Sequence, residues 1–323
     1  MGNRSRKIRK EKIFELYAQN LELVKRHPKV NLEGERTSGY ICPLCNKIYD
    51  KGAFSPEYVD QLTEEHFPPG KLGGSVKILT CKICNNTHGS ELESHLKEHL
   101  ITQDFLKGDS EASRPARFLT DGKFDIGGQI LKTSTGFHFR AVRQISNHNH
   151  FDKLFRVEKP DLKKIDITIT GLYKRRKAEI ALLRIAYLWL YSEFGFAIMY
   201  NSNMHKIREQ IQEPEKKIIE NLRSLELDYP EEMEGINIIT KPKKLQSYVA
   251  LFKTETNSTV RKHAVFLPGP TENGLDIYSY LTRNDKDKLK FTKLDTEGVL
   301  YNPQRVFDYF EYWTYLCENA TNT

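Results

Sequence analysis

The sequence predicts an α+β protein, with a small cysteine-rich unit near the N-terminus followed by a larger region of helices and strands. Two Cys-x-x-Cys pairs lie within the first hundred residues, and helical and alternating apolar patterns follow one another through the rest of the chain. Hydrophobic residues make up 38% of the chain and charged residues 29%. This balance is typical of a globular protein with buried cores and argues against disorder of the whole chain.

Residues 1–27 are expected to form a basic arm that runs into a helix. Ile13, Leu16, Tyr17 and Leu21 recur at helical spacing. Residues 1–12 hold six basic side chains and one acid, which leaves five of the net +7 charges on this short segment. Such an arm suits nucleic-acid phosphates, although a solvated terminus explains the charges as well.

Neither a secretory signal nor a membrane span is expected. The basic N-terminus is not followed by an apolar run with a small-residue cleavage site, so we expect a cytoplasmic protein. The longest apolar stretch, residues 180–191, is interrupted by Arg184 and followed by Glu193. It is shorter than a membrane span requires, and we interpret it as a buried helix.

Four of the five cysteines form the pairs Cys42-Pro-Leu-Cys45 and Cys81-Lys-Ile-Cys84. In a chain without an export signal, such pairs indicate a metal site rather than disulfides. Two turns of this kind supply the four thiolates of a structural zinc site, which has no open coordination position for chemistry. The fifth cysteine, Cys317, lies in an aromatic stretch and is interpreted as a small core side chain.

The insert between the two cysteine pairs carries the chemistry. It contains Glu65-His66 followed by two prolines, a Gly-Gly loop, a short apolar strand, and then Cys84-Asn85 at a helix start. Over residues 40–100 this combination resembles the HNH endonuclease family. The resemblance implies a zinc-stapled ββα-metal nuclease module, to which we assign residues 28–100.

Carried over to this chain, the resemblance makes His66 the general base, Glu65 a metal-binding carboxylate and Asn85 the second protein ligand of a catalytic Mg²⁺ or Mn²⁺. A neutral imidazole is able to take a proton from water near neutral pH. Carboxylate and amide oxygens suit a hard cation that stabilises charge on a phosphodiester. The resemblance implies that the protein binds nucleic acid, and double-stranded DNA is the substrate we expect.

Each of these side chains also has a plainer interpretation. Taken alone, His66 is more typical of a satisfied surface or loop histidine, and Asn85 is a good helix cap. His88 lies about one turn after Asn85 and joins or replaces it as a metal ligand in a further alternative. His95 and His99 have the four-residue spacing of a metal-binding pair, but a solvated helix face is the expectation there.

Two residues depart from the family pattern and keep rival functions open. Glu65 stands where Asp is usual, and Val76 stands where many members have an asparagine that pins the loop beside the base. A protein that kept the fold as a zinc-dependent nucleic-acid-binding module and lost the chemistry is therefore the main rival. A ribonuclease built on the same module is a further rival. If the protein cuts both strands of a duplex, a homodimer would suit the paired cuts.

The remaining chain is expected to form a linker over residues 101–116 and an α+β accessory domain over residues 117–323. The linker rests on the polar run GDSEASRP, and the domain is expected to position DNA or a partner. Strands are expected within residues 117–170 and at 236–240, 246–254 and 260–267, and helices at 177–199, 204–212 and 302–318.

Overall fold

The computed structural model describes residues 3–28, 30, 39–55, 57–108, 113–120, 124–133, 135–156, 165–169, 173–242, 245, 247–283 and 289–313. Helices and strands alternate along the chain, so the predicted α+β class is confirmed. The chain forms two compact units: the first comprises Met1–Glu93, Arg176–Thr254 and Arg261–Thr323, and the second comprises Ser94–Arg175 and Glu255–Val260.

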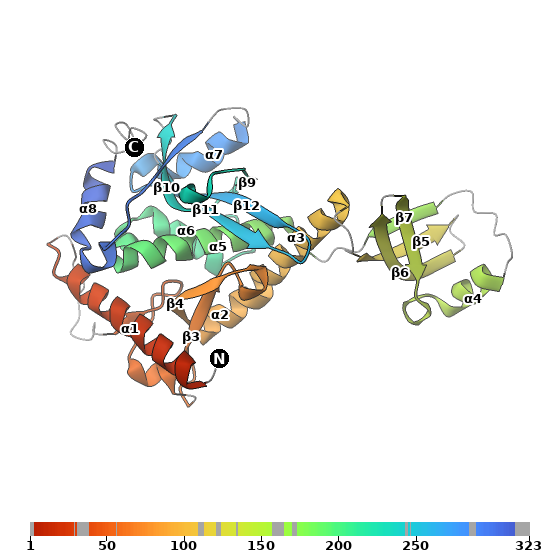
Figure 1. Ribbon diagram of the computed structural model, residues 1–323, viewed down its shortest axis with the longest axis horizontal. Coiled ribbons are helices and arrows are strands. Elements are labelled where there is room, and N and C mark those ends of the chain that lie inside the picture. Colours follow the sequence, from red (N-terminus) through yellow and green to blue (C-terminus); the bar gives the residue numbers. More distant parts are fainter. Residues whose placement is uncertain are drawn as a thin grey trace. The chain divides into compact units, whose positions relative to one another are not determined.

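The first unit begins with helix α1 (Asn3–Lys25), which the sequence predicts. Its buried stripe consists of Phe14, Tyr17, Leu21 and Val24, each at most 4% exposed. These positions are three, four and three residues apart, which places them on one face of a helix. The helix therefore packs into the core of the unit, in contact with β1 and β4 (Figure 1), rather than forming a free arm.

The cysteine-rich segment follows α1 and ends with two strands and a helix, β3, β4 and α2. A short antiparallel pair comes first, and a longer antiparallel hairpin leads directly into α2. The elements are β1 (Tyr40–Ile41), β2 (Ile48–Tyr49), β3 (Leu62–Phe67), β4 (Ser75–Cys81) and α2 (Lys82–His88), and a π-helical turn (Gly89–Glu93) continues α2. In Figure 1 the hairpin and α2 lie on the same side of the unit as α1.

The rest of the first unit is a helix pair and an antiparallel sheet. Helix α5 (Arg175–Phe194) is largely buried, and α6 (Asn203–Gln212) follows after a 3₁₀ segment (Gly195–Tyr200). The sheet order is β13-β10-β11-β12-β9. Its strands are β9 (Ser224–Glu226), β10 (Gly235–Lys241), β11 (Ser247–Glu255), β12 (Val260–Pro268) and β13 (Lys290–Lys293), and helices α7 (Asp276–Arg283) and α8 (Gln304–Glu311) complete it.

Helix α5 and its continuation, Arg175–Tyr200, form one stretch that is long and apolar enough to cross a membrane by length and composition. Its most apolar window is 83% buried inside the protein, as in the core helix of a folded unit. The prediction of a buried helix here is confirmed.

The second unit is a four-stranded antiparallel sheet with two helices. The strand order is β7-β6-β5-β8, and Phe105, Ala116 and Ile130 form the centre of its core. Its elements are α3 (Ser94–Lys107), β5 (Ser113–Thr120), β6 (Phe124–Thr133), β7 (Gly136–Ala141), α4 (His148–Arg156) and β8 (Ile165–Ile169).

The predicted boundaries differ from these units in three places. The module expected over residues 28–100 extends too far, because the first unit ends its first stretch at Glu93 and α3 begins the second unit at Ser94. The linker expected over residues 101–116 is wrong, because α3 runs to Lys107, β5 starts at Ser113, and Leu100 and Phe105 are buried. The accessory domain expected over residues 117–323 is also not one body, since α5, α6 and the large sheet belong to the first unit. Cys317 and the end of the predicted closing helix lie outside the described residues.

Candidate functional site

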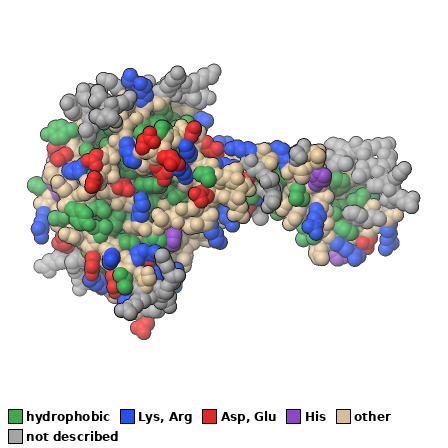
Figure 2. Space-filling view, in the orientation of Figure 1, with side chains coloured by type: hydrophobic (Ala, Val, Ile, Leu, Met, Phe, Trp, Pro, Cys, Tyr) green, Lys and Arg blue, Asp and Glu red, His purple; other side chains and the backbone are tan. Residues whose placement is uncertain are grey.

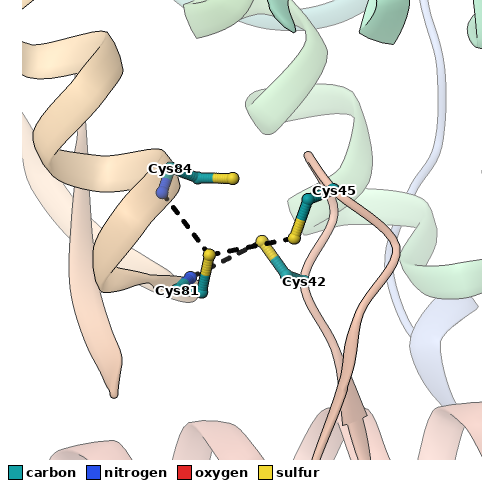
Figure 3. Close-up of side chains that lie close together, drawn as sticks. All are labelled: Cys42, Cys45, Cys81 and Cys84. Atoms are coloured by element: carbon teal, nitrogen blue, oxygen red, sulfur yellow. Dashed lines mark hydrogen bonds between the residues drawn. The ribbon is translucent and has the colours of Figure 1, made fainter. Parts of the chain in front are cut away.

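The four paired cysteines converge on one point (Figure 3). Their Sγ atoms all lie within 4.8 Å of one another, and Cys45 Sγ lies 3.8 Å from Cys81 Sγ. A tetrahedral zinc ion with Zn–S bonds of about 2.3 Å holds its sulfurs roughly 3.8 Å apart. The cluster therefore fits a single four-coordinate metal ion, as the cysteine spacing predicts. Among the described residues it is the one group of three or more His, Cys, Asp or Glu side chains close enough to share an ion.

Local backbone geometry builds each half of this cluster. In the first half, Asn46 has φ +61° and its amide donates to Cys42 O at 2.9 Å, which closes a tight turn. In the second half, Cys81 is the N-cap of α2, and its sulfur accepts from the Cys84 amide at 3.4 Å. Hydrogen bonding to Cys42 is the largest cause that lowers the pKa of the Cys81 thiol, to about 6. Such a thiol readily supplies the thiolate that a metal needs.

The loop that joins β3 and β4 of the hairpin is compact. A Cβ on Gly74 would lie 1.4 Å from Pro68 O, and Gly73 has φ +89°, so both positions require glycine. The Leu72 and Gly74 amides both donate to Pro69 O. These main-chain contacts keep the loop compact beside His66.

His66 lies near the end of β3 and is exposed, unlike its neighbours Glu65 and Phe67. Its ring stands over the compact loop, since a Cβ on Gly70 would lie 3.5 Å from His66 Cδ2. The ring makes no hydrogen bond to any other residue that the structure describes. The extra residue of the irregular pairing is Lys77 on β4, so β3 keeps its alternation and continues past His66 to Phe67.

Glu64 shares the face of β3 with His66 and connects it to α1. Arg9 forms a two-pronged ion pair with Glu64, at 2.8 Å on each oxygen, and Arg6 lies 3.5 Å from the same carboxylate. Burial would raise the pKa of Glu64, but the Arg9 hydrogen bond and the charges of Arg9, Arg6 and His66 outweigh it and lower that pKa. The basic first turns of α1 therefore lie over the strand that presents His66.

Glu65 points to the opposite side, into the interior. Its Oε2 accepts a hydrogen bond from Thr80 Oγ1 at 2.7 Å and lies 2.9 Å from Arg184 Nη2. The other guanidinium nitrogen, Nη1, pairs with Glu93 Oε1 at 2.8 Å. Glu65 and Arg184 are at most 1% exposed. This corrects the expectation that Glu65 faces a catalytic cation beside His66, because alternation along an unbroken strand puts the two side chains on opposite faces.

Asn85 lies inside α2, where its amide nitrogen donates to Thr63 Oγ1 at 2.9 Å and to Glu64 O at 3.2 Å. The N-cap of α2 is Cys81, so the alternative in which Asn85 caps the helix is wrong. Within the described part of the chain, no hydrogen bond to Asn85 Oδ1 is formed. Asn85 thus joins α2 to β3 one residue before the Glu65–His66 pair and keeps one oxygen available.

His88 is buried at 2% exposure, and its Nδ1 has no hydrogen-bond partner among the described residues. Burial is the main cause that lowers its pKa to about 3, and the charge of Arg184 adds to the shift. The imidazole is therefore neutral at pH 7. This interior position does not place His88 on the exposed side of the hairpin with His66, as the alternative of an additional metal ligand would require.

His95 and His99 belong to the second unit and do not lie on the simple solvated helix face that was expected for them. His95 Nδ1 accepts a hydrogen bond from the Lys174 amide at 3.1 Å, and the His99 ring packs on Tyr173 with 4.9 Å between centroids. Both side chains are half-buried and hold the segment before α5 against α3.

Sequence reasoning missed the parts that Arg184 and Glu64 play. The signal for Arg184 was present, because a charge inside a buried apolar helix must find a partner.

Comparisons of this chain with protein-family models, with curated proteins and with solved structures found no match in any of the three.

Proposed function

We propose that this chain is an HNH-type endonuclease that hydrolyses phosphodiester bonds, with His66 as general base and a structural zinc ion held by Cys42, Cys45, Cys81 and Cys84. The observation that carries the proposal is His66 itself, an exposed imidazole without a hydrogen-bond partner among the described residues, on the first strand of a strand–strand–helix unit stapled by four cysteines. An imidazole in this state is free to accept a proton from an attacking water molecule.

The surrounding residues support binding of a nucleic-acid backbone at this face. Basic and acidic side chains are interspersed on the face of the larger unit drawn in Figure 2, so net charge alone marks no binding surface. At His66, however, Arg6 and Arg9 share the single acid Glu64. The net positive charge there suits a phosphate group of the nucleic-acid backbone. We propose that the substrate is double-stranded DNA in the cytoplasm, and that a homodimer makes paired cuts on its two strands.

A divalent cation, Mg²⁺ or Mn²⁺, supplies positive charge for the developing oxyanions when it is bound. Asn85 fits the part of a ligand, because its Oδ1 accepts no hydrogen bond from the described residues. Glu65 does not fit in its present position, because Arg184 neutralises it in the interior. The proposal therefore assigns the proton transfer to His66 and routes no step through a cation on Glu65.

The same ion pair favours a second candidate function. If Arg184 holds Glu65 permanently, the unit keeps its zinc-stapled fold and binds nucleic acid without cutting it. The two functions differ in a single measurable property, which is whether the wild-type protein breaks phosphodiester bonds in the presence of a divalent metal.

The test is nicking of supercoiled plasmid, and of a labelled RNA, by the wild type and by His66→Ala in Mg²⁺, in Mn²⁺ and in chelator. His138→Ala removes an exposed histidine of the second unit and is the matched control. We expect the wild type and His138→Ala to nick DNA and His66→Ala to lose about 100-fold or more of that activity while keeping its zinc. Absence of cutting by zinc-loaded wild type on both substrates would instead support the binding protein.

A further inference from the structure

The first unit contains a cavity of about 410 Å³ that lies outside the proposed nuclease site. This volume is in the range of pockets that enclose small organic ligands. Residues from α1, the cysteine-rich segment, the 3₁₀ segment after α5, and α6 line it: Leu21, Ile41, Asn46, Ile48, Phe196, Met199, Tyr200, Ser202, His205 and Arg208.

Most of the cavity wall is apolar. Leu21 and Phe196 are buried core residues at 1% exposure, whereas Ile48 is 43% exposed. An apolar side chain left in contact with water next to a buried apolar wall is a favourable surface for a hydrophobic ligand, because binding removes more of that area from water.

One side of the cavity carries a buried cation without an acid. Arg208 is 4% exposed, and its hydrogen-bond partners are the neutral groups Tyr187 Oη at 3.4 Å and His205 Nδ1 at 2.9 Å. Among the described residues, no carboxylate lies within ion-pairing distance of its guanidinium. Buried charges in folded proteins are normally paired, so this arginine lacks the anion expected beside it.

Two further polar side chains, Tyr200 and His205, line the cavity. The Tyr200 hydroxyl is buried and has no hydrogen-bond partner among the described residues. Burial and the neighbouring Arg208 lower the pKa of His205, in that order, so the imidazole stays neutral and its Nδ1 accepts the hydrogen bond from Arg208. An anionic acceptor at Arg208 would give this guanidinium the charged partner that it lacks among the described residues.

We propose that this cavity binds a small organic anion, with a compact apolar body against Leu21, Phe196 and Met199 and a carboxylate or phosphate head at Arg208. A nucleic-acid backbone fits less well, because it is charged at every step and would leave the apolar wall unused. The proposal does not depend on the nuclease function.

Some residues that line the cavity adjoin the turn that carries Cys42 and Cys45. Ile41 and Asn46 flank the Cys42–Cys45 turn, and Tyr187, the partner of Arg208, donates a hydrogen bond to Pro43 O at 2.8 Å. A ligand bound at Arg208 therefore contacts the loop that holds two of the four cysteines, and its binding is expected to stabilise the folded unit.

The experiment uses the full chain with zinc bound and a matched pair of fluorescent probes. 8-Anilinonaphthalene-1-sulfonate has an aromatic body with an anionic head, and N-phenyl-1-naphthylamine has the same body without the charge. Binding of each is titrated for the wild type, for Met199→Trp, which fills the cavity, and for Arg208→Gln, which removes the cation. Arg140→Gln removes an exposed arginine of the second unit and is the matched control. Near-ultraviolet circular dichroism checks that each variant is folded.

We expect one anionic probe per wild-type chain, bound roughly 10-fold or more tightly than the neutral probe, a preference worth about 1.4 kcal/mol or more. Met199→Trp should weaken both probes, Arg208→Gln should remove only the preference for the anion, and Arg140→Gln should change neither. If Arg208→Gln proves unfolded, Arg208→Lys replaces it and should retain the preference in part. Equal affinity of the wild type for both probes, or binding unaffected in folded Met199→Trp, would overturn the proposal.

Discussion

Arg184 is the residue on which the interior of the candidate site depends. It lies on a helix of mostly apolar residues, and its guanidinium is held between Glu65 and Glu93. Burial by itself lowers the pKa of Arg184, but the charges of the two carboxylates raise it above its ordinary value. The arginine is therefore a fixed internal cation beside Glu65, the carboxylate that the family resemblance assigns to a metal ion.

Replacement of Arg184 tests this balance. Arg184→Met leaves Glu65 buried without its cation, and loss of one partner of a buried pair typically costs about 3–5 kcal/mol. The double variant Glu65→Leu/Arg184→Met removes both charges and should recover most of that loss. Urea unfolding with zinc present measures both. Equal stability of Arg184→Met and the wild type would show that Glu65 does not need the arginine.

A pH prediction follows from His88. Its pKa in the fold is about 3, below the unfolded value near 6.5, so the unfolded chain binds the proton first as the pH falls. This contribution leaves stability unchanged above pH 6.5 and lowers it progressively between pH 6.5 and pH 3. From pH 7.5 to pH 5 the wild type should lose about 2 kcal/mol from this residue.

The comparison variant is His88→Gln, which has no titrating group at this position. Its unfolding free energy should decline less steeply over the same range, with zinc content measured at each pH so that metal loss is not mistaken for titration. Parallel pH profiles of the two proteins would contradict the assignment of a buried neutral imidazole.

At the level of residues, the sequence predicts what is local. Two Cys-x-x-Cys turns were enough to predict the metal cluster, because each turn places two thiolates by itself. The surroundings of Glu65 were not predictable, because its partner Arg184 comes from α5, far along the chain. Because Glu65 and His66 are adjacent in sequence, they were predicted to act together at one catalytic metal site. Strand β3 instead continues through both residues and places their side chains on opposite faces.

At the level of elements, the β3–β4 loop shows how the backbone positions His66. Gly74→Ala would place a Cβ 1.4 Å from Pro68 O, so the loop must open. We expect this variant to lose stability and, if the chain is a nuclease, to lose nicking activity with its zinc retained. Gly89→Ala is the control, because Gly89 has helical angles and its nearest neighbour for a Cβ is Glu93 Oε2 at 3.9 Å.

The control should be neutral or slightly more stable, by about 0.5–1 kcal/mol, because alanine favours a helix more than glycine does. Thermal unfolding and plasmid nicking are measured on both variants. A Gly74→Ala protein as stable and as active as Gly89→Ala would mean that the compact loop does not position the histidine.

Helix α1 shows where composition alone was insufficient. Its basic first turns suggested an arm, but the apolar stripe that begins at Phe14 buries the helix and Arg9 is engaged by Glu64. Likewise, the polar run after Lys107 suggested a long linker, although Leu100 and Phe105 already carry α3 into the core of the second unit. In both segments tertiary packing decided what the local sequence left open.

At the level of the whole molecule, the first unit is assembled from three separate stretches of chain. The cysteine-rich segment buries Tyr40 against Tyr17 of α1, with 5.8 Å between the ring centroids. Tyr187 of α5 donates to Pro43 O, and Arg184 of the same helix neutralises Glu65. The predicted module of residues 28–100 therefore shares its core with α1 and α5.

We accordingly predict that residues 28–100 alone do not form a stable fold even with zinc. The zinc cluster should assemble, because four thiolates in two short turns suffice for it, but the exposed core around Tyr40 and the unneutralised Glu65 should prevent cooperative folding. The measurement is a thermal transition by circular dichroism with dispersion of amide NMR signals, taken on the zinc-loaded fragment and on the full chain. A cooperative transition in the fragment near that of the first unit would show that the module is autonomous and that α1 and α5 only decorate it. A non-cooperative, zinc-bound fragment would show that the helices outside the motif complete the fold that presents His66.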